Sequence, residues 1–258
     1  MSVLFGDQRW PQLQAAIESN ALVILPIGQM EEHGPHLPVS TDATIADAVG
    51  LRLAEKLTEE GIRTLVLPAV WTGYSSKDMT HWPGTMRIRP QVFMDLVFDV
   101  CSSLIEMGFG KLMLLTCHGH HTGALRVVTR QIADAHDVYM ALVSPGSLAA
   151  ERFQEIRKSG RGGSIHAGEY ETSLMLHLGG PVDMTKATDE DAMRYHSDFV
   201  AGDNFFGGQR VFWSTWGLQE SKTGAYGDPT VATAETGRDM MEAMVENTAA
   251  FAREFMSA

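Results

Sequence analysis

The sequence predicts an α/β protein, a three-layer sandwich with a mainly parallel central sheet and helices on both faces. Short, continuously apolar runs, which are typical of strands buried on both sides, alternate with amphipathic helical patterns. The chain has 258 residues and 44% hydrophobic residues, enough for one such domain with a large core. No linker, repeat or low-complexity tract divides the sequence, so we expect a single domain over residues 1–258.

Four apolar runs are the predicted strands, at residues 22–27, 64–70, 112–117 and 138–143. Helical patterns lie between them, the clearest at residues 91–107, and a final helix is expected from about residue 232 to 255. Strands that alternate with helices pair in parallel, and ligands then bind beyond the carboxyl ends of the strands. Functional side chains are therefore expected directly after strands.

Composition argues against several classes of partner. A net charge of −12 without a basic cluster argues against nucleic acid, since phosphate binding depends on clustered Lys and Arg. No apolar segment approaches the ~20 residues of a membrane span, so no membrane partner is expected. Cys101 is predicted in a helix and Cys117 at a strand end, which disfavours a disulfide and fits a reducing cytoplasm.

Metal-binding side chains follow the first and third predicted strands. Glu31, His33 and Asp42 come after the first strand, and His118 comes after the third. One edge of the sheet would bring these residues together. Carboxylates and imidazoles suit Zn, Mn or Fe better than metals bound by thiolates. The alternative is a surface loop of polar residues and a histidine that merely caps a strand.

Several ordered motifs resemble the creatininase family. The longest is residues 25–38, Leu-Pro-Ile-Gly-Gln-Met-Glu-Glu-His-Gly-Pro-His-Leu-Pro, with Thr41 and Asp42 after it. Further matches are Trp-Pro-Gly-Thr at 82–85, Cys-His-Gly at 117–119, His-Ala-Gly-Glu-Tyr-Glu-Thr-Ser at 166–173 and Gly-Asp-Pro at 227–229. They occur in the family's order and span residues 20 to 235.

The resemblance implies a creatininase-like fold, a homohexamer and two divalent ions per chain, Zn or Mn or else Fe, bridged by an aspartate and a water. Glu31, Asp42 and His118 would hold one ion, while His33 and the shared Asp42 would hold part of the other. His166 would be the catalytic or substrate-contacting histidine.

The last ligand of the second ion stays open between two residues. Creatininase itself carries a glutamate two residues after the metal-binding histidine, where this chain has His120. Glu171 is the preferred replacement and His120 is its competitor. An unligated Glu171 could instead shuttle a proton, which makes it a candidate catalytic residue as well.

Substrate contacts are predicted at Ser76, His36 and His120. Each has a structural alternative: a small polar turn for Ser76, a hydrogen bond inside a tight loop for His36, and a role in orienting a ligand for His120. Residues 203–228, rich in glycine and aromatic side chains, could form a lid or a subunit contact, with Phe205, Phe206 and Trp216 as its candidates.

The predicted activity is hydrolysis by a metal-activated water, with His166 protonating the leaving nitrogen. Creatininase has a tryptophan and a glutamate near its catalytic histidine, and this chain has Gly162 and Ile165 there, so creatinine is not the expected substrate. We expect an enzyme that cleaves a C–N bond in a small linear or cyclic amide. Two alternatives remain: C–C cleavage that opens a cyclic ketone or inositol-derived diketone, and a non-catalytic metal-binding protein.

Overall fold

A parallel four-stranded sheet forms the centre of the computed structural model, which describes residues 2–200, 202–206, 211–213 and 219–258. The strand order is β2-β1-β3-β4. The strands are β1 (Leu22–Ile27), β2 (Thr64–Val66), β3 (Lys111–Thr116) and β4 (Ala141–Val143). A second, antiparallel sheet joins β5 (Ser164–His166) to β6 (Tyr226–Gly227).

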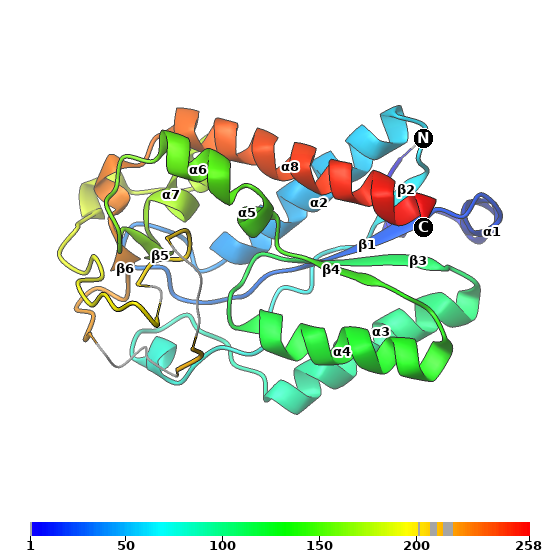
Figure 1. Cartoon of the computed structure of the whole chain (residues 1–258), viewed down its shortest axis with the longest axis horizontal. Coiled ribbons are helices and arrows are strands. Elements are labelled where there is room, and N and C mark those ends of the chain that lie inside the picture. Colours follow the sequence, from blue (N-terminus) through cyan, green and yellow to red (C-terminus); the bar gives the residue numbers. More distant parts are fainter. Residues whose placement is uncertain (1, 201, 207–210, 214–218) are drawn as a thin grey trace.

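Helices cover both faces of the main sheet, as Figure 1 shows. One layer holds α2 and α8 with the short helices α5 to α7, and the other holds α3 and α4. The bounds are α1 (Trp10–Glu18), α2 (Thr41–Glu59), α3 (Pro90–Met107), α4 (His121–His136), α5 (Pro145–Leu148), α6 (Ala150–Ile156), α7 (Glu169–His177) and α8 (Ala234–Ser257). Single 3-10 turns lie at Phe5–Asp7, Asp78–Thr80, Met184–Lys186 and Pro229–Val231.

Strand β1 contributes side chains to two hydrophobic cores, because successive side chains point to opposite faces of the sheet. Leu22 and Ile24 pack in the core that α2 and α8 cover, and Val23 and Leu25 pack in the core beneath α3 and α4. All six residues of β1 are buried. The predicted α/β sandwich with a mainly parallel sheet is therefore confirmed.

Two predicted strands are shorter than expected. Strand β2 ends at Val66, two residues before Pro68, which has no backbone N–H to give to a ladder. Strand β4 keeps only the last three residues of the predicted run, starting at Ala141. The β5–β6 pair was not predicted, because a two-residue strand carries no periodic pattern in the sequence.

The segment predicted as a lid or subunit contact is only partly described. Phe205 packs within the chain, with its ring centroid 4.5 Å from that of Phe153 and 5.0 Å from that of Tyr170. Phe206 lies under the guanidinium of Arg157, 4.6 Å away. Trp216 lies outside the described residues. Phe205 and Phe206 therefore pack against residues of their own chain.

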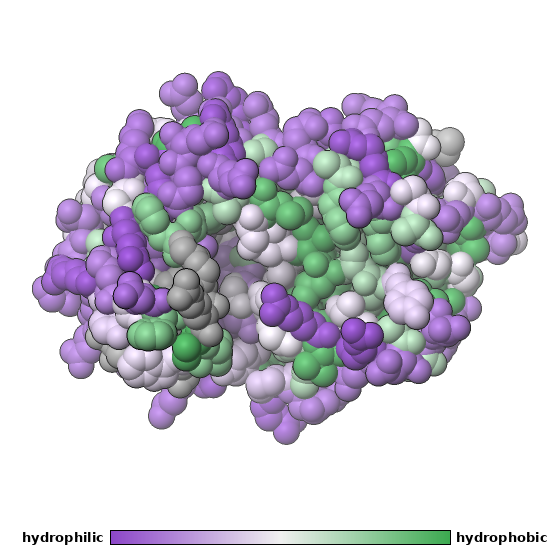
Figure 2. Space-filling view, viewed as in Figure 1, coloured by the Kyte–Doolittle hydropathy of each residue, from purple (hydrophilic) through white to green (hydrophobic). Residues whose placement is uncertain are grey.

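Hydrophilic residues cover the helix layers in Figure 2, and a hydrophobic band shows between α4 and the helices above it. This band follows the side of the sheet that ends in β4. Within the described part of the chain, no helix is both long and apolar enough to cross a membrane.

Candidate metal centre

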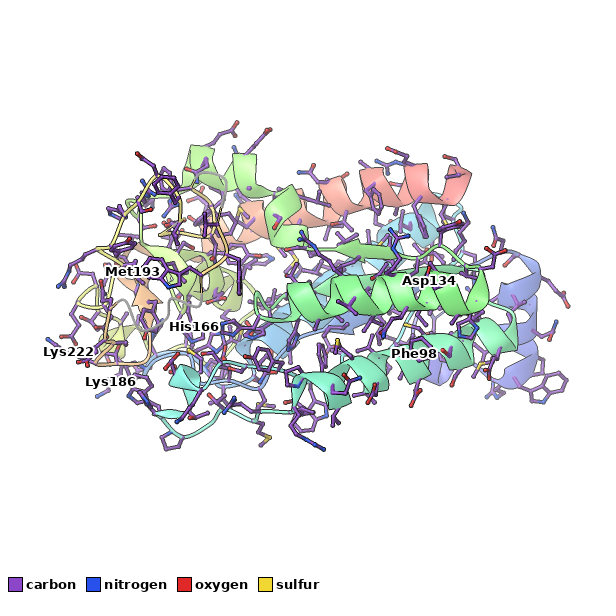
Figure 3. All side chains as sticks on the ribbon, turned by 60° about the horizontal axis from the view of Figure 1, so that its bottom comes forward. Phe98, Asp134, His166, Lys186, Met193 and Lys222 are labelled. Atoms are coloured by element: carbon purple, nitrogen blue, oxygen red, sulfur yellow. The ribbon has the colours of Figure 1, made fainter. Side chains whose placement is uncertain are left out.

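The candidate site lies at the carboxyl ends of the central strands, where parallel sheets bind ligands. Figure 3 places His166 in this half of the molecule, with Phe98 and Asp134 in the other half. The loop after β1 supplies Glu31 and His33, and the loop after β3 supplies His118. Asp42 stands in the first turn of α2, and Glu171 in the first turn of α7.

Asp42 occupies the middle of the cluster, and the protein buries it almost completely, leaving 1% of its surface exposed. Its Oδ1 lies 3.2 Å from Nε2 of His33, and its Oδ2 lies 2.8 Å from Nδ1 of His118. The two oxygens of one carboxylate thus face imidazoles on opposite sides. This is the arrangement that a bridging ligand needs.

Gly28 makes this position of Asp42 possible. A Cβ on Gly28 would lie 2.4 Å from Cα of Ala43 and 2.7 Å from the carbonyl carbon of Asp42. Only a residue without a side chain therefore lets the end of β1 approach the first turn of α2 this closely.

On one side of Asp42, His33 faces Glu171. The Nε2 of His33 lies 4.0 Å from Oε2 of Glu171, while its Nδ1 donates a hydrogen bond of 2.9 Å to the carbonyl of Glu31. Because that bond uses the proton on Nδ1, Nε2 is the nitrogen that a metal would bind, as in histidines that bind metals. Glu171 is fixed by the backbone N–H of Ala167, 2.5 Å away, and Ala167 holds a left-handed φ of 52° to present it.

On the other side, His118 faces Glu31. The Nδ1 of His118 lies 3.6 Å from Oε2 of Glu31. The hydroxyl of Ser75 donates a short hydrogen bond to Oε1 of Glu31, and Arg87 in turn donates to the Ser75 carbonyl at 2.9 Å. Ser76 was predicted as a site residue and Ser75 was not, because nothing in a run of two serines indicates which hydroxyl reaches Glu31.

Among the described residues, histidines are the only basic side chains in contact with these carboxylates. In the described ranges, no Lys or Arg nitrogen lies within 4.0 Å of Glu31, Asp42 or Glu171. Burial, together with the neighbouring Asp42 carboxylate, raises the pKa of Glu171 to about 7 and raises that of Glu31. Burial would lower the pKa of His33, but the carboxylates, led by Asp42, outweigh it and raise the pKa to about 10. The cluster attracts positive charge.

This donor set fits divalent cations. Buried carboxylates without Lys or Arg partners are costly unless a cation compensates them, and mixed carboxylate and imidazole ligands suit Zn and Mn. Among the described residues, two sets of three side chains could each hold an ion. One set is Glu31, His118 and His120, and the other is His33, His166 and Glu171. Within each set the ligand atoms lie within 4.8 Å of one another. Asp42 lies between the two groups through its contacts with His33 and His118.

His166 touches both the cluster and the neighbouring Glu32. Its Nε2 donates a 2.7 Å hydrogen bond to the carbonyl of Glu32, and its Nδ1 lies 3.8 Å from Oε2 of Glu31. Burial lowers the pKa of His166 well below its ordinary value, so its imidazole is neutral and Nδ1 can accept a proton. Glu32 was not among the residues predicted from the sequence. It is only 4% exposed, and burial raises its pKa to about 7.

The three predicted substrate contacts lie in different environments. His36 bonds to the Thr172 hydroxyl at 3.0 Å and thereby ties the β1 loop to α7. Ser76 has a buried hydroxyl without a hydrogen-bond partner among the described residues. His120 lies beside His118, with ring centroids 5.1 Å apart, and burial together with His118 lowers its pKa to about 3. His120 is therefore a neutral imidazole.

Comparison with known proteins places this geometry in a family. A family model described as creatinine amidohydrolase, or creatininase, matches residues 6–252. The mycofactocin precursor peptide peptidase of Mycobacterium tuberculosis is 30% identical over 87% of this chain and 82% of its own. Creatinine amidohydrolase of Pseudomonas putida is 28% identical over 69% and 72%. The 3-dehydro-scyllo-inosose hydrolase of Thermotoga maritima is 27% identical over 68% and 56%.

Solved structures share the fold. A manganese creatininase superposes with a TM-score of 0.81 at 24% identity, covering 98% of each chain. A mutant creatininase of a zinc–zinc type has the same TM-score, identity and coverage. With the family model spanning nearly the whole sequence, the chain belongs to the creatininase family and is an enzyme of the amidohydrolase type.

Proposed function

We propose that this enzyme hydrolyses an amide C–N bond of a small molecule at a site that holds two divalent ions. The observation that carries the proposal is Asp42, whose two carboxylate oxygens face His33 on one side and His118 on the other. Glu31, Asp42 and His118 would hold the first ion. His33, Asp42 and Glu171 would hold the second, because Glu171 and not His120 lies beside His33.

Ions bound there would acidify a water molecule and polarise the carbonyl group of the substrate. The chain's own residues handle the protons. Nδ1 of His166 faces the cluster, 3.8 Å from Oε2 of Glu31, and would accept a proton from the attacking water, while Nε2 donates to the Glu32 carbonyl. The imidazolium formed can then protonate the departing nitrogen. Ser76 and His36 are proposed to face or position the substrate.

Two relatives support an amide substrate. One is named for cleaving a precursor peptide and another for the hydrolysis of creatinine, and both names imply cleavage of a C–N bond. The inosose hydrolase, together with the histidine-rich turn at His118, His120 and His121, favours C–C cleavage of a cyclic ketone as the second candidate.

Substrate profiling distinguishes the two candidates. The metal-loaded enzyme would be offered short peptides, linear amides, cyclic amides and cyclic ketones, with Asp42→Asn as the inactive control. Release of ammonia, an amine or an amino acid supports the proposal. Ring opening to a keto acid without nitrogen release supports the second candidate. A fully loaded enzyme that is inert on all four classes would count against both.

The assembly and the compartment stay predictions. The homohexamer rests on resemblance to the family and would be measured by light scattering after size-exclusion chromatography. The cytoplasmic location rests on composition, and fractionation of cells would test it.

A further inference from the structure

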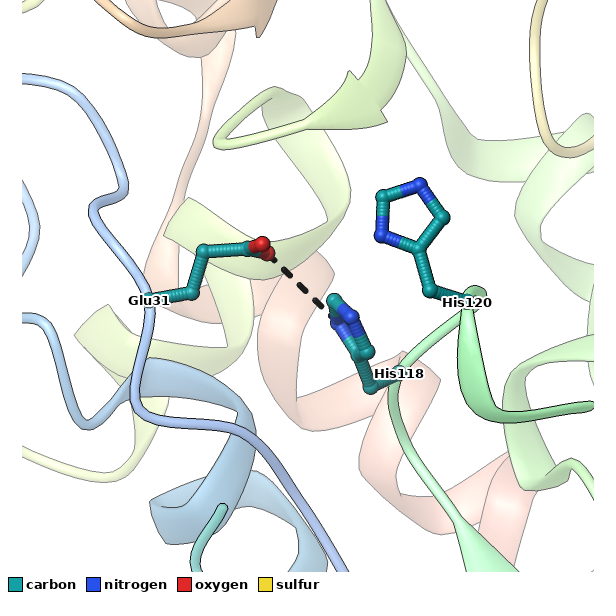
Figure 4. Close-up of side chains that lie close together, drawn as sticks. All are labelled: Glu31, His118 and His120. Atoms are coloured by element: carbon teal, nitrogen blue, oxygen red, sulfur yellow. Dashed lines mark ion pairs between the residues drawn. The ribbon is translucent and has the colours of Figure 1, made fainter. Parts of the chain in front are cut away.

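His120 stands where the chain departs most clearly from the creatininase pattern, and its position suggests a use. It is the residue before α4, two residues after His118, with Gly119 between them. Figure 4 shows its ring beside Glu31 and His118, with one ring nitrogen on the side that faces them. The ligand atoms of these three side chains all lie within 4.8 Å of one another.

The rings of His118 and His120 are oriented so that a nitrogen of each could bind the same ion. The rings of His118 and His120 meet at 75°, with centroids 5.1 Å apart, so they are not stacked face to face. Nδ1 of His118 already points at Oε2 of Glu31 and Oδ2 of Asp42, at 3.6 and 2.8 Å. Ligand atoms around a tetrahedral zinc lie roughly 3.3 Å apart, so small side-chain rotations would close the remaining gap.

His120 is also surrounded in a way that suits a ligand. Both of its ring nitrogens are buried, and a neutral imidazole carries a lone pair on one of them. The ring of Tyr74 stands edge-on beside it, with centroids 6.3 Å apart. A Cβ at Gly119 would meet nothing within 4 Å, so the turn that places His120 is not forced by crowding there.

We propose that His120 is a direct ligand of the first ion, beside Glu31, Asp42 and His118, and that it does not bind the second. This inference rests on the proposed two-ion site. The first ion would then have two imidazoles and two carboxylates, whereas the second would have one imidazole from His33 and the carboxylates of Asp42 and Glu171.

The unequal ligand sets predict unequal metal preferences. Imidazole favours Zn, while carboxylate and water favour Mn. The first position should therefore select Zn over Mn more strongly than the second position does. The protein would hold Zn in the first position even where Mn is abundant.

His120→Ala tests the assignment, with His136→Ala as the matched control at the far end of α4. Competition with a chelator gives two stepwise zinc affinities for the wild type. We expect His120→Ala to weaken one of these zinc affinities by at least about 100-fold and to leave the other unchanged. Mutation of a residue that only hydrogen-bonds to a metal ligand lowers metal affinity by about 10–100-fold, so the loss of a direct ligand should reach at least the upper end of that range. The preference of that position for Zn over Mn should shrink. His136→Ala should change neither affinity.

X-ray absorption of the zinc-loaded wild type keeps the test independent of how the variant folds. The spectrum of the wild type should fit three imidazoles per pair of zinc ions, from His33, His118 and His120. Unchanged zinc affinities in His120→Ala, with only two imidazoles per pair in the wild type, would overturn the role of His120 and leave the two-ion site standing. A wild type that binds no zinc would instead defeat the proposed function.

Discussion

Ser75 shows how a residue outside the ligand set controls one inside it. It is fully buried, and its hydroxyl donates to the oxygen of Glu31 that does not face His118. That bond fixes the carboxylate plane and leaves Oε2 directed at the imidazole. Hydrogen bonds orient two other candidate ligands in the same way. The Glu31 carbonyl orients the ring of His33, and the Ala167 N–H orients the carboxylate of Glu171.

Ser75→Ala should weaken binding of the first ion by about 10–100-fold, the usual effect of losing a hydrogen bond to a metal ligand. The fold should survive, since the change removes one oxygen from a packed site. Chelator competition measures the effect, and the neighbouring Ser76→Ala is the control, because the Ser76 hydroxyl bonds to no described residue. Equal zinc affinities for both variants would mean that Ser75 does not orient Glu31.

Arg157 and Asp203 form a buried ion pair that holds the approach to β5. Their side chains are 4% and 0% exposed and lie 2.9 Å apart, and Asp203 also accepts hydrogen bonds from the N–H groups of Gly162 and Ser164. Because β5 ends in His166, this pair helps to fix the position of a candidate catalytic residue.

Arg157→Ala should lower the free energy of unfolding by about 3 kcal/mol, because it leaves the Asp203 carboxylate buried without its cation. Denaturant titration gives the value. Arg152→Ala is the control: its pairs with Glu155 and Asp239 are accessible to solvent, so little change is expected. If both variants unfold at the same denaturant concentration, the buried pair does not stabilise the fold as proposed.

At the scale of elements, the contact between β1 and α2 couples the fold to the site. Gly28 follows the last residue of β1, and α2 carries Asp42 in its first turn. The two elements meet so closely that backbone and not side chains forms the contact. A shift of α2 would therefore move the candidate bridging carboxylate directly.

Gly28→Ala should destabilise the protein by about 1–3 kcal/mol through overpacking and should also weaken metal binding by moving Asp42. Gly123→Ala in α4 is the control, since a Cβ there meets nothing within 4 Å, and it should stabilise by roughly 0.5–1 kcal/mol. Thermal unfolding and zinc titration measure both effects. A Gly28→Ala protein with normal stability and normal zinc binding would contradict this coupling.

Elements with a strong sequence pattern were predictable, and those defined by tertiary contacts were not. Strand β1 appears at residues 22–27 as predicted, and helix α3 differs from its prediction by one residue, because six or more apolar positions give a clear period. The run at 64–70 was taken as one strand although Pro68 interrupts its ladder. The β5–β6 pair depends on bonds between residues at least sixty positions apart, which no local window contains.

Across the whole molecule, the two hydrophobic cores and the carboxyl-terminal edge of the sheet together position the candidate site. The cores on either side of the sheet hold the strands in place, and the loops at their carboxyl ends bring Glu31, Asp42 and His118 within contact. Sequence motifs identified these three residues. They could not identify Ser75 or Glu32, whose importance comes from which way a side chain turns in the folded chain.

Metal should stabilise the entire fold because the folded chain gathers ligands that the unfolded chain disperses. At a free zinc concentration about 1,000 times its dissociation constant, the gain is about 4 kcal/mol per site. Thermal unfolding with and without a chelator measures it, and the chelator should lower the midpoint in the wild type but hardly in Asp42→Asn. Identical wild-type midpoints would show that folding and metal binding are not linked.

The most direct test of the central claim is metal content by elemental mass spectrometry, on protein purified without added metal. Asp42→Asn is compared with Asp47→Asn, a change on the same helix at a side chain that accepts a hydrogen bond from the Ala69 N–H and from no other described residue. The account predicts two divalent ions per chain in the wild type and in Asp47→Asn, and their loss in Asp42→Asn. A wild type that lacks Zn, Mn and Fe and binds none when they are supplied would contradict it.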